Sequence, residues 1–306
     1  MKPKKNEKIA ARRRGKDKNP LSPHEKYLLG VRRDKMRVRI WQVSVLVAFI
    51  GLWELLTAVG AMDPFFMSSP SRIAVTFVQL MADDFMYHIG VTLLECIIGF
   101  AISMLAGCAI AIALWLSPFA KRVAEPYLVV LNALPKVALG PLLIIWVGSG
   151  AKAIVLMAVL ICIIVTVISV LEGLCSAAPD KLLLLRSMGA SRLQLLRYAV
   201  LPSAVPTFLS VLKINVGLSW VGTVMGEYLV SGAGLGYLIV YGGQVFKTDL
   251  VMTATVTLCA LAALMYGAVA LAEKLYMRSK KKRRTADKVS RCLLYTSDAA
   301  DDLTRV

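Results

Sequence analysis

The chain has 306 residues, 58% of them hydrophobic, and a mean hydropathy of +0.67. A soluble domain of this length is much less apolar, so the composition excludes a soluble globular protein and predicts an integral membrane protein. The formal net charge of +17 does not indicate nucleic-acid binding, because the Lys and Arg residues gather beside apolar segments, where they mark membrane topology.

Residues 1–38 form a basic leader ahead of the first apolar segment. The leader contains Pro, Gly and Asn and has no apolar period, so we expect it to be largely disordered, above all from residue 1 to about residue 25. The apolar segment that follows has the length of a membrane span, and it begins too late for a cleavable signal peptide.

Six segments are long enough to cross about 30 Å of hydrocarbon as helices. The third is interrupted by Pro126, Pro135 and Pro141. Such residues are tolerated at membrane depth where protein or water satisfies the freed backbone groups, so we expect this broken span to face the bundle interior. The predicted spans are residues 40–61, 90–116, 123–147, 153–171, 203–226 and 250–272.

Charge asymmetry between the loops predicts the topology. With six spans, Lys121, Arg122 and the basic residues 280–284 fall on the same side as the leader. The opposite side carries acidic residues such as Asp63 and Asp83. Because cytoplasmic loops are enriched in Lys and Arg, we expect an all-α membrane protein of six transmembrane helices with its N and C termini in the cytoplasm.

Three segments outside the spans differ in composition. Residues 62–72 contain two Pro and several Ser, so we expect a turn there, followed by a short interfacial helix. Residues 231–243 are Gly-rich and too short to span, which favours a re-entrant loop or short helix on the outer side; they lack the Lys of a phosphate-binding loop. Segment 279–306 begins with basic residues, and its polar tail after Ala286 has the character of non-native, appended sequence.

Cysteine and histidine form neither a metal nor a disulfide pattern. Four of the six Cys lie within apolar segments, no CxxC occurs, and His24 and His88 are far apart. We therefore expect packing roles for these Cys, no metal site and no cofactor bound by the chain. An enzyme is not expected either, because no set of His, Cys or paired carboxylates forms a catalytic pattern.

A basic, amphipathic segment of about residues 175–201 lies between the fourth and fifth spans. Pro179 and Asp180 suit the first turn of a helix, where Pro loses no hydrogen bond and the helix dipole favours a negative charge. Gly189 suits the left-handed cap that ends this helix.

Ser191 and Gln194 have the spacing of a capping box, which begins a second helix that runs toward Pro202. The segment is therefore predicted to be a helix–turn–helix hairpin. It suits either an interfacial helix pair lying on the lipid or a docking element for a cytoplasmic partner. The residues of interest in it are Pro179, Asp180, Arg186, Met188, Gly189, Ala190, Ser191, Gln194, Leu201 and Pro202.

This hairpin resembles the cytoplasmic loop of the permease subunits of binding-protein-dependent ABC importers. That loop carries Glu-Ala-Ala, three residues, Gly, nine residues, Ile, one residue and Leu-Pro, and here Gly189 and the Leu201-Pro202 pair have the matching spacing. Residues 183–185 are all Leu in place of Glu-Ala-Ala, and Ala199 replaces Ile. The acidic side chain of the family is therefore absent, while the Gly and Pro on which the hairpin geometry depends are present.

Further segments narrow the resemblance. Together, MGASRLQLLRYAVLPSAVP, LKINVGLSW, GEYLVSGAGLGYLI and PFFMSSPS are most similar to the branch that handles sulfonates, taurine, nitrate and thiamine-pyrimidine precursors. The resemblance implies a type I ABC importer permease fold over residues 39–278, in the inner or plasma membrane of a prokaryote. It also implies a second permease copy in a homodimer, two cytoplasmic ATPases that use ATP, and an extracytoplasmic solute-binding protein. The sequence has no Walker A pattern of its own.

Polar residues within the spans are candidates for the translocation path. Lys213 is a deep cation that suits an anionic solute such as a sulfonate, taurine or nitrate; its alternative role is an ion pair with Glu95 or Glu54. A thiamine pyrimidine precursor or another small solute is the alternative substrate, and an ion-coupled secondary transporter is the alternative class of protein. The path candidates are Asn132, Lys136, Lys213, Asn215 and Trp220.

Overall fold

The computed structural model describes residues 23–61, 67–230 and 232–303. In these residues the chain forms helices and turns and no strand, as the sequence predicts. The chain divides into two compact units, Met1–Ser71 and Arg72–Val306.

The first unit contains α2 (Pro23–Ala58), whose part from Leu29 onward is apolar enough to cross a membrane. The predicted first span is thus present, but its helix begins within the leader. The described part of the leader, from Pro23 onward, is helical, and the expectation of disorder for the leader as a whole stays a prediction. The expectation for residues 1–22 falls outside the described residues.

A polar contact joins the end of this unit to its own helix. The carboxylate of Glu54 accepts hydrogen bonds from the backbone N–H of Ser71, at 3.1 Å, and from its hydroxyl, at 2.8 Å. Ser68 has a positive φ of 45°, which fits the predicted turn. The short helix α4 (Pro70–Leu80) follows, as expected from its amphipathic sequence.

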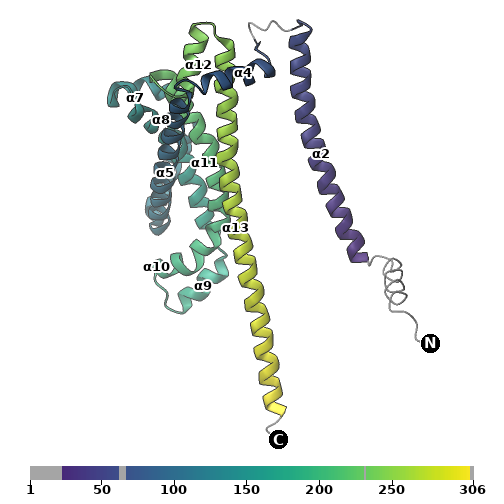
Figure 1. The fold of residues 1–306 in the computed structure, drawn as a ribbon. Helices are drawn as coiled ribbons and strands as arrows, with labels where there is room; N and C mark the ends of the chain where they lie inside the picture. The colour runs from purple at the N-terminus through teal and green to yellow at the C-terminus, as the bar shows by residue number, and fades with distance from the viewer. Residues whose placement is uncertain (1–22, 62–66, 231, 304–306) are drawn as a thin grey trace, which may run out of the picture. The chain divides into compact units, whose positions relative to one another are not determined.

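The second unit is a helical bundle centred on α5 (Phe85–Leu116), α8 (Ala151–Cys175) and α11 (Leu201–Val230). Alongside them runs α13 (Thr248–Leu303) (Figure 1). Each of these four helices contains a segment long and apolar enough to span. Their cores match the predicted second, fourth, fifth and sixth spans; α5, α8 and α11 extend them by a few residues, and α13 continues well beyond the sixth.

Small residues let the central helices approach closely. A Cβ added to Gly222 of α11 would lie 2.5 Å from Cα of Ala158 in α8, and one added to Gly99 of α5 would lie 2.7 Å from the Ala158 Cβ. Gly107 of α5 meets Thr166 of α8 in the same way. Without a hydrophobic force between helices in lipid, such close backbone packing holds the bundle together.

The predicted third span is broken in the structure. It consists of α6 (Pro118–Ala133), the 3₁₀-helix η1 (Lys136–Leu139) and α7 (Gly140–Val147), which bend by 86°. Counting this bent pair as one span gives six candidate spans among the described residues, and five helices qualify singly.

The expectation that this segment faces the bundle interior holds for α7, where Gly140 and Leu143 are buried, but not for α6. No residue of α6 is buried within the described chain, so this part does not face the interior of its own bundle. The backbone is satisfied locally instead. Lys136 donates from Nζ to the carbonyl oxygen of Asn132, at 3.1 Å, next to the break at Pro135.

The Gly-rich segment predicted as a re-entrant loop or short helix forms α12 (Leu235–Gln244), which packs on α13. The non-native character expected of the C-terminal tail stays a prediction. The backbone of α13 stays helical to Leu303, beyond the point where the sequence loses its apolar period. No Gly or Pro follows Gly267 to interrupt it.

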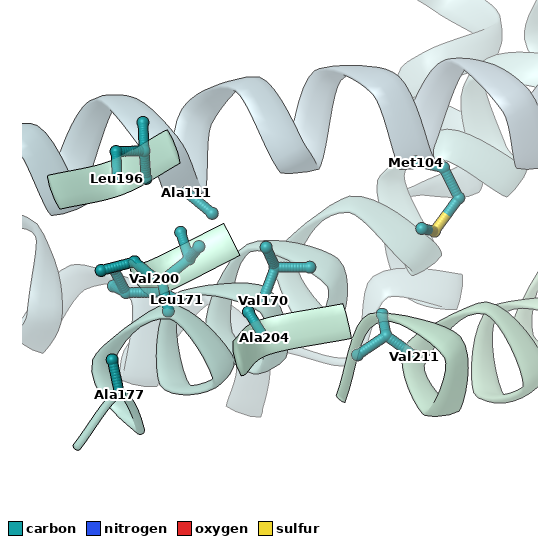
Figure 2. Packing of buried hydrophobic residues seen from close by; sticks show 10 residues of the cluster. Met104, Ala111, Val170, Leu171, Ala177, Leu196, Val200, Ala204 and Val211 are labelled. Carbon is teal, nitrogen blue, oxygen red and sulfur yellow. The ribbon is translucent and has the colours of Figure 1, made fainter. Parts of the chain in front are cut away.

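A hydrophobic cluster lies where α11 begins. Figure 2 shows Val200 and Ala204 beside Leu171 and Val170 of α8, with Ala111 of α5 nearby. All of these side chains are buried. The segment that precedes α11 is therefore packed into the bundle core at one end, called here the hairpin end; the opposite end, which carries α12, is called the α12 end.

Candidate functional site

The hairpin consists first of α9 (Pro179–Ser187), with Pro179 in its first turn and Asp180 beside it. The helix ends where Gly189 takes a φ of +79°. The N–H of Ala190 then donates to the carbonyl oxygen of Leu185 at 3.0 Å. The predicted left-handed cap is thus present, and it satisfies carbonyl groups that the helix end leaves free.

The second arm begins with α10 (Arg192–Leu195) and the predicted capping box is present. The N–H of Ser191 donates to Oε1 of Gln194 at 2.7 Å, and the N–H of Gln194 donates to Oγ of Ser191 at 3.4 Å. A π-helical turn, η2 (Leu196–Val200), joins this arm to α11 at Leu201 and Pro202. Local sequence therefore fixes both the turn and the start of the second arm.

Two contacts attach the hairpin to the bundle. Arg192 donates from Nη1 to the carbonyl oxygen of Leu116, the last residue of α5, at 2.8 Å. Leu196 and Val200 belong to the buried cluster of Figure 2. The hairpin is thus tied to α5 by a charge-assisted hydrogen bond and to α8 by apolar packing.

The remaining surface of the hairpin is exposed, with apolar side chains set among charged ones such as Lys181 and Arg186. No residue of α9 is buried within the described chain. Exposed apolar side chains on such a specified structure are typical of a surface that receives a partner. The exposed side chains are Leu183, Leu184, Met188, Leu193 and Tyr198, with Met188 75% exposed.

Asn215 and Trp220, two candidates for the translocation path, are buried in the bundle. Nδ2 of Asn215 donates to Oγ1 of Thr166 at 2.7 Å and to Sδ of Met104 at 2.9 Å. Trp220 is 5% exposed and belongs to an apolar cluster with Phe85. Within the described chain Asn215 thus packs against α5 and α8, and Trp220 packs against α5, α12 and α13. Their role in a passage stays a prediction.

Lys213 forms an ion pair, but with a partner other than those expected. Its Nζ lies 2.8 Å from Oε2 of Glu273 in α13. The expected partners are engaged elsewhere: Glu54 accepts from Ser71, and Glu95 lies beside Glu227. The sequence could not show this, because the pairing depends on how α13 packs against α11.

Asn132 and Lys136 are brought together as their spacing predicts. They flank the break in the third span, where Lys136 Nζ is 3.5 Å from Asn132 Oδ1. Asn132 is exposed and Lys136 is half-buried. The structure thus separates the path candidates into a pair at this break, an ion pair between α11 and α13, and buried core residues.

The α12 end carries a polar arrangement that the sequence did not reveal. Three successive N–H groups at the start of α12 donate to side chains of two spans: Gly234 to Nδ1 of His88 at 2.9 Å, and Leu235 to Oγ1 of Thr92 at 2.7 Å. Gly236 donates to Oε2 of Glu227 at 2.5 Å. These side chains satisfy the free donors of a helix start and hold α12 to α5 and α11.

Glycine is required at this contact. A Cβ added to Gly234 or to Gly236 would clash with a carboxyl oxygen of Glu227. The signal in the sequence was the Gly-rich start of a short helix, which needs acceptors from elsewhere in the chain. Only the fold shows that His88, Thr92 and Glu227 supply them.

No three His, Cys, Asp or Glu side chains among the described residues come together as metal ligands would. The arrangement defines a polytopic helical membrane protein with an anchored hairpin that presents an apolar surface. It also has a short helix, α12, held by polar side chains at the opposite end.

Residues 99–278 match the model of the family described as binding-protein-dependent transport system inner membrane component. The chain belongs to this family, and it is a permease of the ABC importer branch that includes taurine, sulfonate, nitrate and thiamine-precursor permeases. Members of the family are multi-pass membrane subunits that work with ATPase subunits.

Individual relatives agree with this assignment. A Haemophilus influenzae protein described as "Probable ABC transporter permease protein" is 30% identical over 76% of this chain and 94% of its own. The formylaminopyrimidine transport permease ThiX of Halalkalibacterium halodurans is 30% identical over 61% of this chain and 74% of its own. The taurine permease TauC of Escherichia coli is 25% identical over 73% of this chain and 83% of its own.

A solved structure shows the same fold. The MetNI methionine ABC transporter, in an inward-facing conformation, has a chain with a TM-score of 0.55 and 19% identity. The match covers 61% of this chain and 94% of that one.

Proposed function

We propose that the chain is the transmembrane permease subunit of an ATP-driven importer of a small solute, with residues 175–202 as the docking element for a separate ATPase. The observation that carries the proposal is the hairpin itself. Its turn is fixed by Gly189, its second arm begins at a capping box, and its exposed surface is apolar. A lipid-lying helix pair would not need its end tied to α5 by Arg192.

In this proposal the hairpin end and both termini face the cytoplasm, and the chain itself uses no ATP. Closure of two ATPases would move the hairpins of two permease copies. Because Leu196 and Val200 lie in the same buried cluster as Leu171 and Ala111, that movement would reach α8 and α5 together. The α12 end would then face the extracytoplasmic binding protein.

The solute is proposed to be small and of the kind that the branch handles. Relatives carry the names of permeases for taurine, aliphatic sulfonates, nitrate and formylaminopyrimidine. The sequence argument for an anionic solute depended on Lys213. In the structure this cation is paired with Glu273, so it gives no preference for an anion.

The test is reconstitution of the chain with its ATPase and its solute-binding protein in proteoliposomes, using a Ser191→Cys variant in which the exposed Cys175 and Cys259 are replaced by Ser. We expect solute uptake with ATP and none with a non-hydrolysable analogue or an ion gradient alone. We also expect the thiol introduced at position 191 to react with a membrane-impermeant maleimide only from the side that binds the ATPase. Uptake driven by an ion gradient without the ATPase, or labelling from the opposite side, would contradict the proposal.

A further inference from the structure

The start of α12 is held by two side chains that can gain or lose a proton. Nδ1 of His88, in α5, accepts a hydrogen bond from the N–H of Gly234 at 2.9 Å. Oε2 of Glu227, in α11, accepts one from the N–H of Gly236 at 2.5 Å. The acceptor between them is the hydroxyl of Thr92, which stays neutral. The attachment of α12 to two spans therefore depends on the protonation of His88 and Glu227.

Glu227 is one of two carboxyl groups that are buried side by side. It is 1% exposed, and Glu95 of α5, to which it is hydrogen-bonded, is 4% exposed. Each group has one buried oxygen without a donor in the described chain, Oε1 of Glu227 and Oε2 of Glu95. A hydrogen bond between two carboxyl groups requires a proton on one of them, and this proton supplies the missing donor. Two ionised carboxylates in contact would repel each other, so the pair keeps one proton.

His88 is in the opposite state, with no proton on the nitrogen that faces α12. Because Nδ1 accepts from the N–H of Gly234, its lone pair points toward the start of α12. A proton on Nδ1 would replace this acceptor with a donor that faces another donor. The ring is half-buried and stacks on Tyr237 of α12, with centroids 6.0 Å apart. His88 is thus both close to α12 and reachable by water, which suits it to respond to acid.

The surrounding ionisable groups do not neutralise the carboxyl pair. In the described chain the two carboxyls interact with each other, with Thr92 and with the backbone of Gly236, and none of these partners is a Lys or Arg. The part of α8 that meets α11 at Gly226 presents Ile154, which does not titrate. The other ionisable residues of the helices around the site are Asp84, Tyr87 and Cys96 of α5, Tyr228 of α11, Tyr237 of α12, the exposed Lys152 of α8 and Asp249 in the first turn of α13.

We infer that α12 is a proton-controlled latch, closed while the Glu95–Glu227 pair holds one proton and Nδ1 of His88 holds none. Acid adds a proton to His88 and breaks its bond with Gly234. Alkali removes the proton of the pair and leaves two negative charges in contact between α5 and α11, which displaces the acceptor of Gly236. The latch therefore opens on both sides of neutrality. The inference does not depend on the proposed function, because these bonds lie within one chain and need neither ATP nor a solute.

Hydrogen exchange measured by mass spectrometry tests the latch in the full chain, purified in lipid nanodiscs. Exchange of peptides that cover residues 232–245 is measured from about pH 5 to about pH 9 and divided by the intrinsic exchange rate at each pH. We expect protection to be greatest near neutrality and to fall about tenfold at each limit, as the loss of one hydrogen bond predicts. Residues 191–201 of the hairpin are the internal reference, because the capping side chains Ser191 and Gln194 do not titrate.

Two conservative variants separate the acid loss of protection from the alkaline loss. Glu95→Gln carries an amide that donates to Glu227 at any pH, so we expect the alkaline loss to disappear and the acid loss to remain. His88→Asn offers an amide oxygen as the acceptor and takes up no proton, so we expect the acid loss to disappear and the alkaline loss to remain. Glu125→Gln, at an exposed carboxylate of α6, and His24→Asn, in the leader, are the matched controls and should leave the whole profile unchanged.

Infrared spectroscopy adds a measurement that needs no variant to fold. The difference spectrum of the unmodified chain between neutrality and about pH 9 should show loss of the carbonyl stretch of a protonated carboxyl group. Size-exclusion chromatography shows whether each variant is folded, and folded Glu95→Gln should lack this band.

Uniform protection of α12 across the pH range would overturn the inference. So would a loss of protection that persists in the folded variant designed to remove it, or the absence of the carbonyl band from the unmodified chain. None of these results bears on ATP dependence, which the proteoliposome experiment measures separately.

Discussion

Arg192 of the hairpin donates a hydrogen bond to the carbonyl oxygen of Leu116, at the end of α5, across 76 positions of sequence. The contact ties the second arm of the hairpin to a span that is not adjacent in the chain. We expect Arg192→Ala to lower ATP-driven uptake several-fold while ATPase binding persists, because the hairpin would move without carrying α5. Uptake and ATP hydrolysis are measured in the same proteoliposomes. Arg122→Ala is the control, since Arg122 bonds only to Pro118 of its own helix among the interactions described; an equal effect of the two variants would count against the tie.

Gly189 has a φ of +79°, and a Cβ added there would meet no atom within 4 Å. Strain rather than a clash therefore decides what the position accepts. We expect Gly189→Val to cost about 1–2 kcal/mol locally and to abolish ATPase co-purification, since a β-branched residue disfavours this conformation. Gly189→Asn should retain most of the ATPase co-purification, because Asn tolerates the left-handed region. Loss of co-purification in both variants would point to a side-chain requirement instead of a backbone one.

Gly222 and Gly217 form a matched pair on α11. A Cβ on Gly222 would lie 2.5 Å from Cα of Ala158, whereas one on Gly217 would meet nothing within 4 Å. We expect Gly222→Ala to destabilise the folded protein by about 1–3 kcal/mol through overpacking. Gly217→Ala should be neutral or stabilising, since Ala favours a helix over Gly by about 0.5–1 kcal/mol. Thermal unfolding in detergent compares the two, and similar melting temperatures would contradict the close approach of α8 and α11.

Because Lys213 and Glu273 form an ion pair, removing both charges should restore stability and uptake that are lost when only one is removed. Either single change to Leu leaves one ionisable side chain without its partner at a partly buried contact between α11 and α13, so we expect reduced stability and uptake. The double variant Lys213→Leu with Glu273→Leu removes both charges and should recover most of both. If Lys213 served the solute directly, the double variant would recover stability but not uptake.

Asn215 is fully buried and donates to Thr166. We expect Asn215→Leu to destabilise the chain by about 1–3 kcal/mol, because the hydroxyl of Thr166 loses a donor at 2.7 Å. A double-mutant cycle with Thr166→Val in thermal unfolding isolates this pair. Asn132→Leu is the exposed control, and an equal loss there would show that the effect does not arise from the buried bond.

The local parts of the fold could be predicted because they depend on neighbouring residues. Apolar length marks the spans, Pro135 marks the break in the third, and the Gly cap and capping box set the hairpin turn. Each of these signals acts over a few residues, where backbone sterics and hydrogen bonding decide the outcome.

The contacts that could not be predicted join residues far apart in the chain. Nothing near Lys213 indicates that Glu273, on the last helix, is its partner. The acceptors for α12 come from His88 and Thr92, more than a hundred residues earlier. The interior position expected of the broken span holds for α7, whose Leu143 packs on α8, but not for α6, which has no buried residue among those described.

The π-helical turn Leu196–Val200 sets the direction in which the hairpin points. A π turn contains one residue more than the α-helical turn it replaces, so everything before it is rotated about the axis of α11 by roughly 100° relative to a continuous helix. Deletion of Ala199 from this turn would restore a continuous helix and rotate the apolar surface of the hairpin about the helix axis, while every residue of that surface is retained. The orientation offered to an ATPase thus depends on a single-residue insertion.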